Sequence, residues 1–182
     1  MEKLIFSFNN QNSKKTINSK EILGGKGANL AEMARLGLPV PPGFTISTKV
    51  CEHFYKNKNK VPKKLIQQVK HEIKKVEKIS KRKFGDLSNP LLVSVRSGSR
   101  VSMPGMMDTV LNLGLNDKTV IALKNKTSNG RFAKDSYRRF IQMYSNVVLG
   151  IEAHLFEEFI DNYKLTKGVI QDTELEESDW DG

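Results

Sequence analysis

The stretch that decides the fold is Val93-Ser-Val-Arg-Ser-Gly-Ser-Arg-Val-Ser-Met-Pro-Gly-Met-Met-Asp-Thr109. The apolar run 91–95 predicts a short strand that is buried on both faces, and Arg96 stands at its end. A strand end holds a side chain rigidly at the rim of a sheet. A guanidinium there offers a planar fork of donors that matches two phosphate oxygens. The stretch therefore predicts a loop, over residues 96–114, that meets an anion rather than one that only packs.

The neighbours of Arg96 fit the same interpretation. Ser97 supplies a hydroxyl beside the open backbone of a glycine, and the methionines around Met106 offer soft apolar surface that suits an adenine face. Asp108 could hold Arg96 or Arg100 in place. Two alternatives stay open: the methionines fill a core, and Arg96 forms a structural salt bridge.

A second stretch of the same kind is Gly24-Gly-Lys-Gly-Ala-Asn-Leu30. Glycines ahead of a helix let backbone amides approach a ligand closely, and a helix start favours anions. Lys26 adds a positive charge at the same place. The stretch lacks the full spacing of a P-loop or a dinucleotide fingerprint, so a tight turn with a surface lysine is the alternative.

The pattern around these stretches is mixed at first and helical later. Strands are expected at 4–8 and 43–47, and helices at 28–36, from Ser47 or Thr48 to Tyr55, and at 61–80. Helices are then expected at 119–126, 131–149 and 151–163. This change places a boundary near residue 115, between a mixed α/β part (1–114) and a helical part (115–182). Ser178 is expected to cap a new helix start. Trp180 has almost nothing after it in the sequence to pack with, so we expect a truncated piece of a longer protein.

Composition narrows the class of protein. The chain has 182 residues and a formal net charge of +10, which favours anionic ligands. Its lone cysteine, Cys51, excludes an internal disulfide; we expect a buried structural thiol and a reducing compartment. The three histidines lack metal-ligand spacing. No run reaches the roughly 20 apolar residues of a membrane helix, so we expect a cytoplasmic protein without a membrane partner.

Three stretches together resemble the start of the pyruvate, phosphate dikinase family. They are Gly24–Met33, Gly37-Leu-Pro-Val-Pro-Pro-Gly-Phe44 and Val93–Gly114, and the run Arg131–Met143 is similar too. Phosphoenolpyruvate synthase shares the early Gly-Gly-Lys and the Val-Arg-Ser core. It is less similar in Met103–Thr109, which makes it the alternative family.

The resemblance implies an α+β fold: the first part of an ATP-grasp nucleotide-binding domain, followed by a truncated helical subdomain. It implies a phosphotransferase that interconverts ATP, pyruvate and phosphate with AMP, phosphoenolpyruvate and pyrophosphate, through a phosphohistidine carried in cis on a central domain. Because the phosphohistidine and pyruvate domains and the acidic Mg²⁺ ligands are absent here, the chain alone is expected to be inactive and without catalytic residues. The whole enzyme is expected to be a homodimer.

Carried over by motif, the residues expected to contact ATP come from both stretches and from the helical part. They are Gly25, Lys26, Gly27, Arg96, Ser97, Met106, Asp108, Thr109 and Arg139, with Arg138 as a substitute for Arg139. A rival of another class is a basic nucleic-acid-binding module. It is disfavoured because the lysine face of the helix at 61–80 lacks aromatic residues that could stack on bases. A naturally shortened, non-catalytic paralogue is the third possibility.

Overall fold

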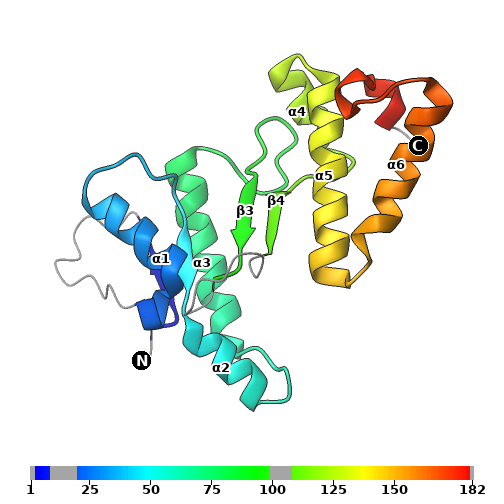
Figure 1. The fold of residues 1–182 in the computed structure, drawn as a ribbon. Helices are drawn as coiled ribbons and strands as arrows, with labels where there is room; N and C mark the ends of the chain where they lie inside the picture. Colours follow the sequence, from blue (N-terminus) through cyan, green and yellow to red (C-terminus); the bar gives the residue numbers. More distant parts are fainter. Residues whose placement is uncertain (1–2, 9–19, 99–107, 181–182) are drawn as a thin grey trace. The chain divides into compact units, whose positions relative to one another are not determined.

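The computed structural model describes residues 3–8, 20–98 and 108–180 (Figure 1). Six α-helices, four short strands and two 3₁₀ turns occur in these ranges, so the chain is α+β as expected. The elements are β1 (Ile5–Ser7), α1 (Lys20–Arg35), β2 (Phe44–Ile46), α2 (Thr48–Lys56), α3 (Lys63–Ser80), β3 (Val93–Arg96), β4 (Thr109–Leu113), α4 (Thr119–Thr127), α5 (Gly130–Leu149), α6 (Ala153–Lys167), η1 (Asp172–Glu174) and η2 (Glu177–Trp180).

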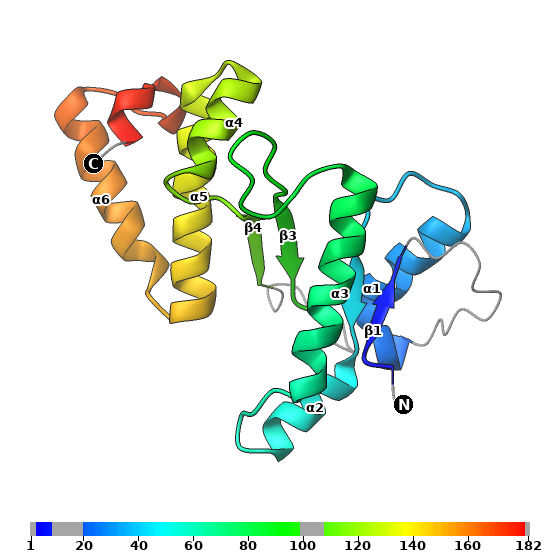
Figure 2. The same cartoon turned by 180° about the vertical axis from the view of Figure 1, so that it is seen from behind.

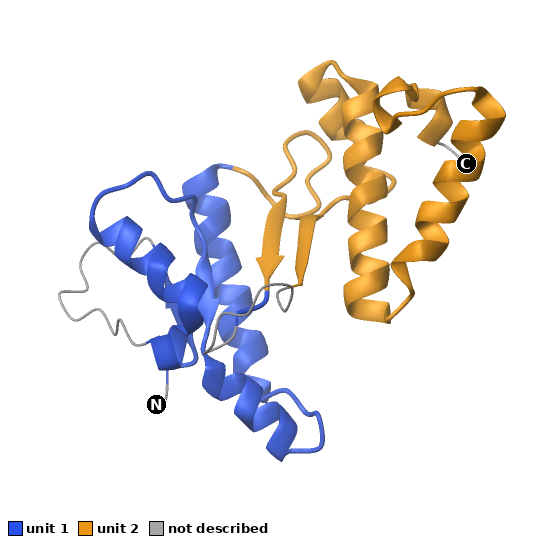
Figure 3. Cartoon of the chain, viewed as in Figure 1, with its two compact units in different colours: residues 1–81, 97–107 blue, residues 82–96, 108–182 orange. Residues whose placement is uncertain are grey.

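The chain separates into two compact units, coloured separately in Figure 3. The first comprises residues 1–81 and 97–107, and the second comprises residues 82–96 and 108–182. The second unit therefore begins before β3 and includes the strand that ends at Arg96. The sequence-based division into domains at residue 115 stays a prediction.

The first unit is a two-stranded antiparallel sheet with helices packed on it. β1 pairs with β2 in the register Ile5↔Ile46, Phe6↔Thr45 and Ser7↔Phe44. Ile5 forms a small core with Val50 of α2 and Leu65 of α3, each less than a tenth exposed. The Ser47 hydroxyl caps α2 by accepting from the Lys49 amide at 3.3 Å. The predicted apolar stripe of α3 is buried only in part: Leu65 and Val76 are each 6% exposed, but Ile66 and Ile79 are 50% and 53% exposed. The lysines of α3 face solvent, as the sequence pattern predicts.

The second unit is built around α5. This helix packs against α4, β4 and η2, and α4 and α5 lie side by side in both views (Figures 1 and 2). Its side toward these neighbours carries small residues, such as the fully buried Ala133, which allow close approach. The Asn129 side chain caps α5 by accepting from the Phe132 amide at 2.9 Å.

Two expectations about the β3 region are wrong. The run at 91–95 is not buried on both faces: Leu91 is 4% exposed, but Val95 is 49% exposed. The reason is that, among the strands of the described residues, β3 has one partner, β4, in a two-stranded antiparallel sheet. Moreover, the end of the expected loop is itself a strand, because Thr109–Leu113 forms β4. The paired residues of β3 and β4 are Val93↔Leu113, Val95↔Val110 and Arg96↔Thr109, and the register is irregular between Val93 and Val95.

The glycine stretch also differs from expectation. It does not precede a helix but lies inside α1, whose backbone is non-helical at Gly24 (φ 69°, ψ 170°). Such a backbone conformation is accessible to glycine and strained for other residues. Gly24 therefore breaks α1, and a second helical segment starts at the next residue.

Candidate functional site

Lys26 lies in the first turn of the helical segment that follows the break at Gly24. The first amide groups of a helical segment lack helical acceptors, and the N-terminal end of the helix dipole favours negative charge. The Lys26 residue is half-buried, whereas a Cβ added at Gly25 would meet no atom within 4 Å. Lys26 thus combines a positive side chain with a helix start and an uncrowded backbone at its neighbour.

Gly27 fixes this turn closely against the sheet. A Cβ built there would lie 2.8 Å from both Cγ2 and Oγ1 of Thr45 in β2. The Thr45 backbone is paired with Phe6 across the sheet, so it has little freedom to withdraw. Close packing against Thr45 therefore explains a glycine at position 27 without any ligand. The sequence pattern alone does not distinguish this packing role from a ligand-binding role.

Arg96 occupies the end of β3, as predicted, and is exposed. Its Nε donates a long hydrogen bond of 3.4 Å to Ser94 Oγ. The cross-strand partner of Arg96 is Thr109, the first residue of β4, and Asp108 immediately precedes it. Three of the expected contact residues are thus gathered at one end of the β3–β4 sheet.

Arg139 belongs to a different element. It projects from α5 with a side chain that is 57% exposed, and its Nε lies 3.1 Å from Asp135 Oδ2. Asp135 is only 15% exposed, so the Arg139 side chain is the exposed member of this pair. Met106 falls outside the described residues. Ser97 is exposed and directly follows β3, and it belongs to the first unit.

The expected residues thus form three groups. Gly25, Lys26 and Gly27 are consecutive in α1 of the first unit; Arg96, Asp108 and Thr109 lie together in the second unit; Arg139 is on α5. The convergence of Lys26 and Arg96 on one ligand, which joins the two units, stays a prediction.

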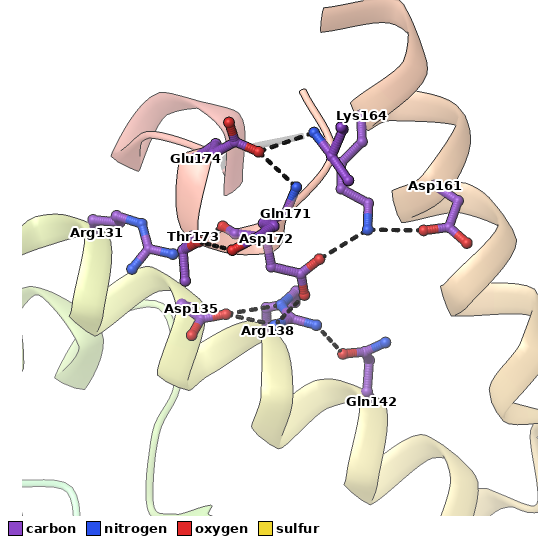
Figure 4. A network of polar contacts seen from close by, with 11 residues as sticks. Arg131, Asp135, Arg138, Gln142, Asp161, Lys164, Gln171, Asp172, Thr173 and Glu174 are labelled. Carbon is purple, nitrogen blue, oxygen red and sulfur yellow. Dashed lines mark hydrogen bonds and ion pairs between the residues drawn. The ribbon is translucent and has the colours of Figure 1, made fainter. Parts of the chain in front are cut away.

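Arg138, the neighbour of Arg139, has a structural role that sequence reasoning missed. Its guanidinium donates to Asp135 at 2.5 and 3.1 Å and to Gln142 at 2.6 Å, and it lies 3.4 Å from Asp172 (Figure 4). The Trp180 ring packs against it, with the guanidinium carbon 4.6 Å from the ring centroid. Its donors therefore serve protein acceptors. Trp180 packs against a residue that precedes it in the sequence, because η2 brings it onto α5.

Further contacts hold the segment 171–180, which we call the C-terminal strap. Arg131 donates to the backbone oxygens of Leu175 at 2.7 Å and Asp172 at 2.8 Å, and Leu175 is only 1% exposed. Lys164 of α6 lies 3.0 Å from Asp172 Oδ1 and 2.9 Å from Asp161. The two hydrogen bonds of Arg131 join residues 44 and 41 positions apart, so no local sequence signal could reveal them.

Charges tune the carboxylates of the strap. Burial acts to raise the pKa of Asp172, but the hydrogen bond from Lys164 and the charges of Lys164, Arg138 and Arg139 outweigh it and lower that pKa. The hydrogen bond from Lys167, with the Glu176 amide, lowers the pKa of Asp179. Neither shift marks a proton donor at neutral pH. The start of η2 also differs from expectation: Ser178 lies inside η2, and the Asp179 carboxylate accepts from the amide of Glu176, the residue before η2, at 2.8 Å.

Other chemistries find little support in the described residues. Cys51 is exposed, which overturns the expected buried thiol, because its position on α2 faces solvent. Among residues 3–8, 20–98 and 108–180, no group of three or more His, Cys, Asp and Glu side chains is arranged to hold a metal ion. None of the helices in these ranges is both long and apolar enough to cross a membrane.

Comparison with known proteins places these motifs in a family. Residues 20–82 match the model of the pyruvate phosphate dikinase AMP/ATP-binding domain. The chain is 52% identical over 180 residues to pyruvate, phosphate dikinase of Rhizobium meliloti (99% of this chain, 20% of the relative). It is 53% identical over 161 residues to that of Entamoeba histolytica (88% and 18%) and 52% identical over 178 residues to the chloroplastic enzyme of Flaveria pringlei (98% and 18%).

The chain spans about a fifth of the length of these relatives. The matched range contains the whole Gly24–Gly27 turn with Lys26, and the alignments extend over nearly all of the chain. The resemblance predicted from the sequence is therefore confirmed, and the chain belongs to the pyruvate, phosphate dikinase family, as part of its N-terminal AMP/ATP-binding region.

Proposed function

We propose that the chain contributes one part of an ATP-binding site, of the ATP-grasp kind, in which Lys26 and Arg96 bind the phosphates of one nucleotide. The observation that carries the proposal is the position of Lys26. It lies in the first turn after a glycine break, inside the range that matches the AMP/ATP-binding domain. A cationic side chain at a helix start suits a polyphosphate, because amide groups and helix dipole act in the same direction.

The second cation comes from the end of β3. Arg96 is exposed, and its only described side-chain hydrogen bond is the long one to Ser94. A guanidinium with unused donors can bind two oxygens of a phosphate at once. Gly25, Gly27, Ser97, Met106, Asp108, Thr109 and Arg139 complete the proposed set.

In the whole protein, we propose that this site serves the conversion of ATP, pyruvate and phosphate into AMP, phosphoenolpyruvate and pyrophosphate. Lys26 and Arg96 would neutralise charge on the phosphates, while a histidine on another domain accepts the transferred phosphoryl group. Phosphoryl transfer depends mainly on positioning and charge neutralisation, which is the chemistry these two side chains offer. Because the histidine that accepts the phosphoryl group is proposed to lie on another domain, we propose that residues 1–182 alone bind ATP weakly and do not complete the dikinase reaction.

Magnesium is part of the proposal only through other regions of the protein. The described residues hold no group of three or more His, Cys, Asp and Glu side chains placed to bind the ion. We propose that the ligands of Mg²⁺ lie in other regions of the whole protein. Homodimerisation of the whole enzyme and a cytoplasmic location are further proposals. The name of the Flaveria relative shows that members of the family also occur in chloroplasts.

A nucleotide series tests the proposal. Binding of ATP, ADP, AMP and adenosine is measured by titration of the purified chain, followed by NMR. If Lys26 and Arg96 meet phosphates, affinity falls along the series, and Lys26→Ala or Arg96→Ala weakens ATP by about 10-fold or more while leaving adenosine unchanged, since a charge-assisted hydrogen bond contributes about 1.5–3 kcal/mol. The matched controls are Lys74→Ala in α3 and Arg82→Ala, both exposed. Equal losses in the controls, or an ATP affinity no better than that of adenosine, would refute the proposal.

A further inference from the structure

A shallow groove with a basic rim lies in the first unit, between α2 and the start of α3, away from the Gly24–Gly27 turn in sequence. Its volume is about 770 Å³. Leu4, Val50 and Pro62 form its apolar floor, since they are buried or half-buried. The exposed side chains of its rim are Lys49, Glu52, His53, Lys56, Lys63 and Lys64. We call this feature the α2–α3 groove. Nothing in the nucleotide proposal uses it.

The charge around the groove is strongly one-sided. Residues 48–64 contain six lysines and a single acidic residue, Glu52. Within the described part of the chain, Lys56, Lys63 and Lys64 form no ion pair with a carboxylate. Unneutralised cations on long stems around an apolar floor attract an anionic partner and orient it.

We propose that the α2–α3 groove docks an acidic, amphipathic segment of a protein. Such a segment places its apolar side chains on Leu4, Val50 and Pro62 and its carboxylates against the lysines of the rim, as an amphipathic helix does in a hydrophobic groove. The positive charge of the rim favours a partner segment with a negative net charge. The apolar floor favours a segment that also carries apolar side chains.

Two other anionic partners fit less well. A single-stranded nucleic acid gains much of its affinity from stacking on aromatic side chains, and the residues that line the groove include no Phe, Tyr or Trp. A duplex, like a free polyphosphate, would bind the lysines but would leave the apolar floor unused. A free polyphosphate would satisfy the lysines but would leave the apolar floor in water. The combination of floor and rim therefore favours a polypeptide.

The test uses a fluorescein-labelled model peptide of glutamate and leucine in which the leucines repeat at helical spacing. Its binding to the whole chain is followed by fluorescence anisotropy. Three probes of equal negative charge accompany it: an all-glutamate peptide, oligo(dT) and inorganic polyphosphate. We expect the amphipathic peptide to bind at least about 10-fold more tightly than each of these, because only it can bury apolar surface on the floor.

Charge reversal locates the site. The variant Lys56→Glu/Lys63→Glu/Lys64→Glu removes three cations of the rim, and we expect it to weaken the peptide by about 10-fold or more. The control Lys70→Glu/Lys74→Glu/Lys78→Glu changes the net charge equally, at exposed positions of α3 outside the groove, and should change affinity less than about 2-fold. Circular dichroism checks that both variants keep the helices of the parent chain.

Several results would overturn the proposal. Equal weakening in both triple variants would show a response to net charge alone. Tighter binding of oligo(dT) with the same dependence on Lys56, Lys63 and Lys64 would assign the groove to nucleic acid, and tighter binding of polyphosphate would assign it to a small anion. No detectable peptide binding at up to ~1 mM would exclude a docking site of useful affinity. Because Lys26 and Arg96 stay intact in both variants, their ATP titration reports separately on the nucleotide proposal.

Discussion

Arg138 is the residue whose removal most directly tests the packing of the C-terminal strap onto α5. The variant Arg138→Met keeps much of the volume of the side chain and removes its charge and its donors. Hydrogen bonds to Asp135 and Gln142, the ion pair with Asp172 and the contact with Trp180 are lost together. The Arg138 side chain is only 17% exposed, so water replaces these contacts poorly.

The magnitude follows from the partners that remain. Asp135 keeps Arg139 at 3.1 Å and Asp172 keeps Lys164 at 3.0 Å, so neither carboxylate is left without a cation. The loss is therefore below that of a fully broken buried pair. We expect a loss of about 3 kcal/mol in the free energy of unfolding, from hydrogen bonds to charged groups at ~1.5–3 kcal/mol each and a cation–π contact of ~0.5–1 kcal/mol. This corresponds to a Tm lower by about 6–12 °C if the chain unfolds in one transition.

Trp180 provides the assay, because it is the only tryptophan of the chain and its ring lies over Arg138. Urea unfolding is followed by its fluorescence and, in parallel, by circular dichroism. Arg139→Met is the matched control, one position away on α5 with a side chain that is 57% exposed, and it should cost less than about 1 kcal/mol. Equal effects of the two substitutions would refute the reasoning that burial, not charge, distinguishes the two arginines.

Three further predictions concern single positions. The Asp86 carboxylate accepts hydrogen bonds from the amides of Asn89 and Ser88 and from the Ser88 hydroxyl, and these bonds lower its pKa to about 2. Because the folded-state pKa lies below the unfolded-state pKa, this stabilisation is present above about pH 4 and is lost as the pH falls toward 2. Asp86→Asn should therefore lower the Tm at pH 6 but not at pH 2, and an NMR titration of the carboxyl group should give the low pKa directly. Gly114 has φ +120°, and a Cβ there would lie 2.5 Å from the Leu91 carbonyl oxygen. Gly114→Ala should therefore destabilise the chain by ~2–4 kcal/mol in urea titrations, whereas the control Gly150→Ala, at φ +72° and in open space, should cost ~1 kcal/mol. Similar costs for the two variants would contradict the clash at Gly114. Gly27→Ala should push α1 away from Thr45, change the chemical shifts of Thr45 and weaken ATP binding in the NMR titration. The control Gly25→Ala, whose Cβ meets no atom within 4 Å, should change the chemical shifts of Thr45 little. Larger shift changes in Gly25→Ala than in Gly27→Ala would contradict the packing at this turn.

Much of the fold follows from local sequence signals. The apolar stripe of α3, the Ser47 cap of α2 and the glycine that ends α5 are local features, so these helices lie within a few residues of their expected bounds. β4 was missed because Thr109–Leu113 follows a glycine- and methionine-rich run that reads as loop, and only its pairing with β3 makes it a strand. The glycine break inside α1 was also missed. Two consecutive glycines are typical of the end of a loop, and their sequence does not indicate a kink within a helix.

The candidate site divides in the same way. The position of Arg96 at a strand end could be predicted, because an apolar run stops there. The choice between Arg138 and Arg139 could not, since both are adjacent on α5 and only the distant Asp172 and Trp180 show that the first is committed to packing. The relation between Lys26 and Arg96 depends on two compact units and stays a prediction.

Chemical footprinting tests that relation most directly. The purified chain is treated with an amine-acylating reagent and, separately, with an arginine-specific dicarbonyl, over a range of ATP concentrations, and modification of Lys26 and Arg96 is quantified by mass spectrometry. If both side chains bind the phosphates of one nucleotide, ATP protects both with the same concentration dependence, and adenosine protects neither. Protection of only one of them, or equal protection by adenosine, would contradict the account.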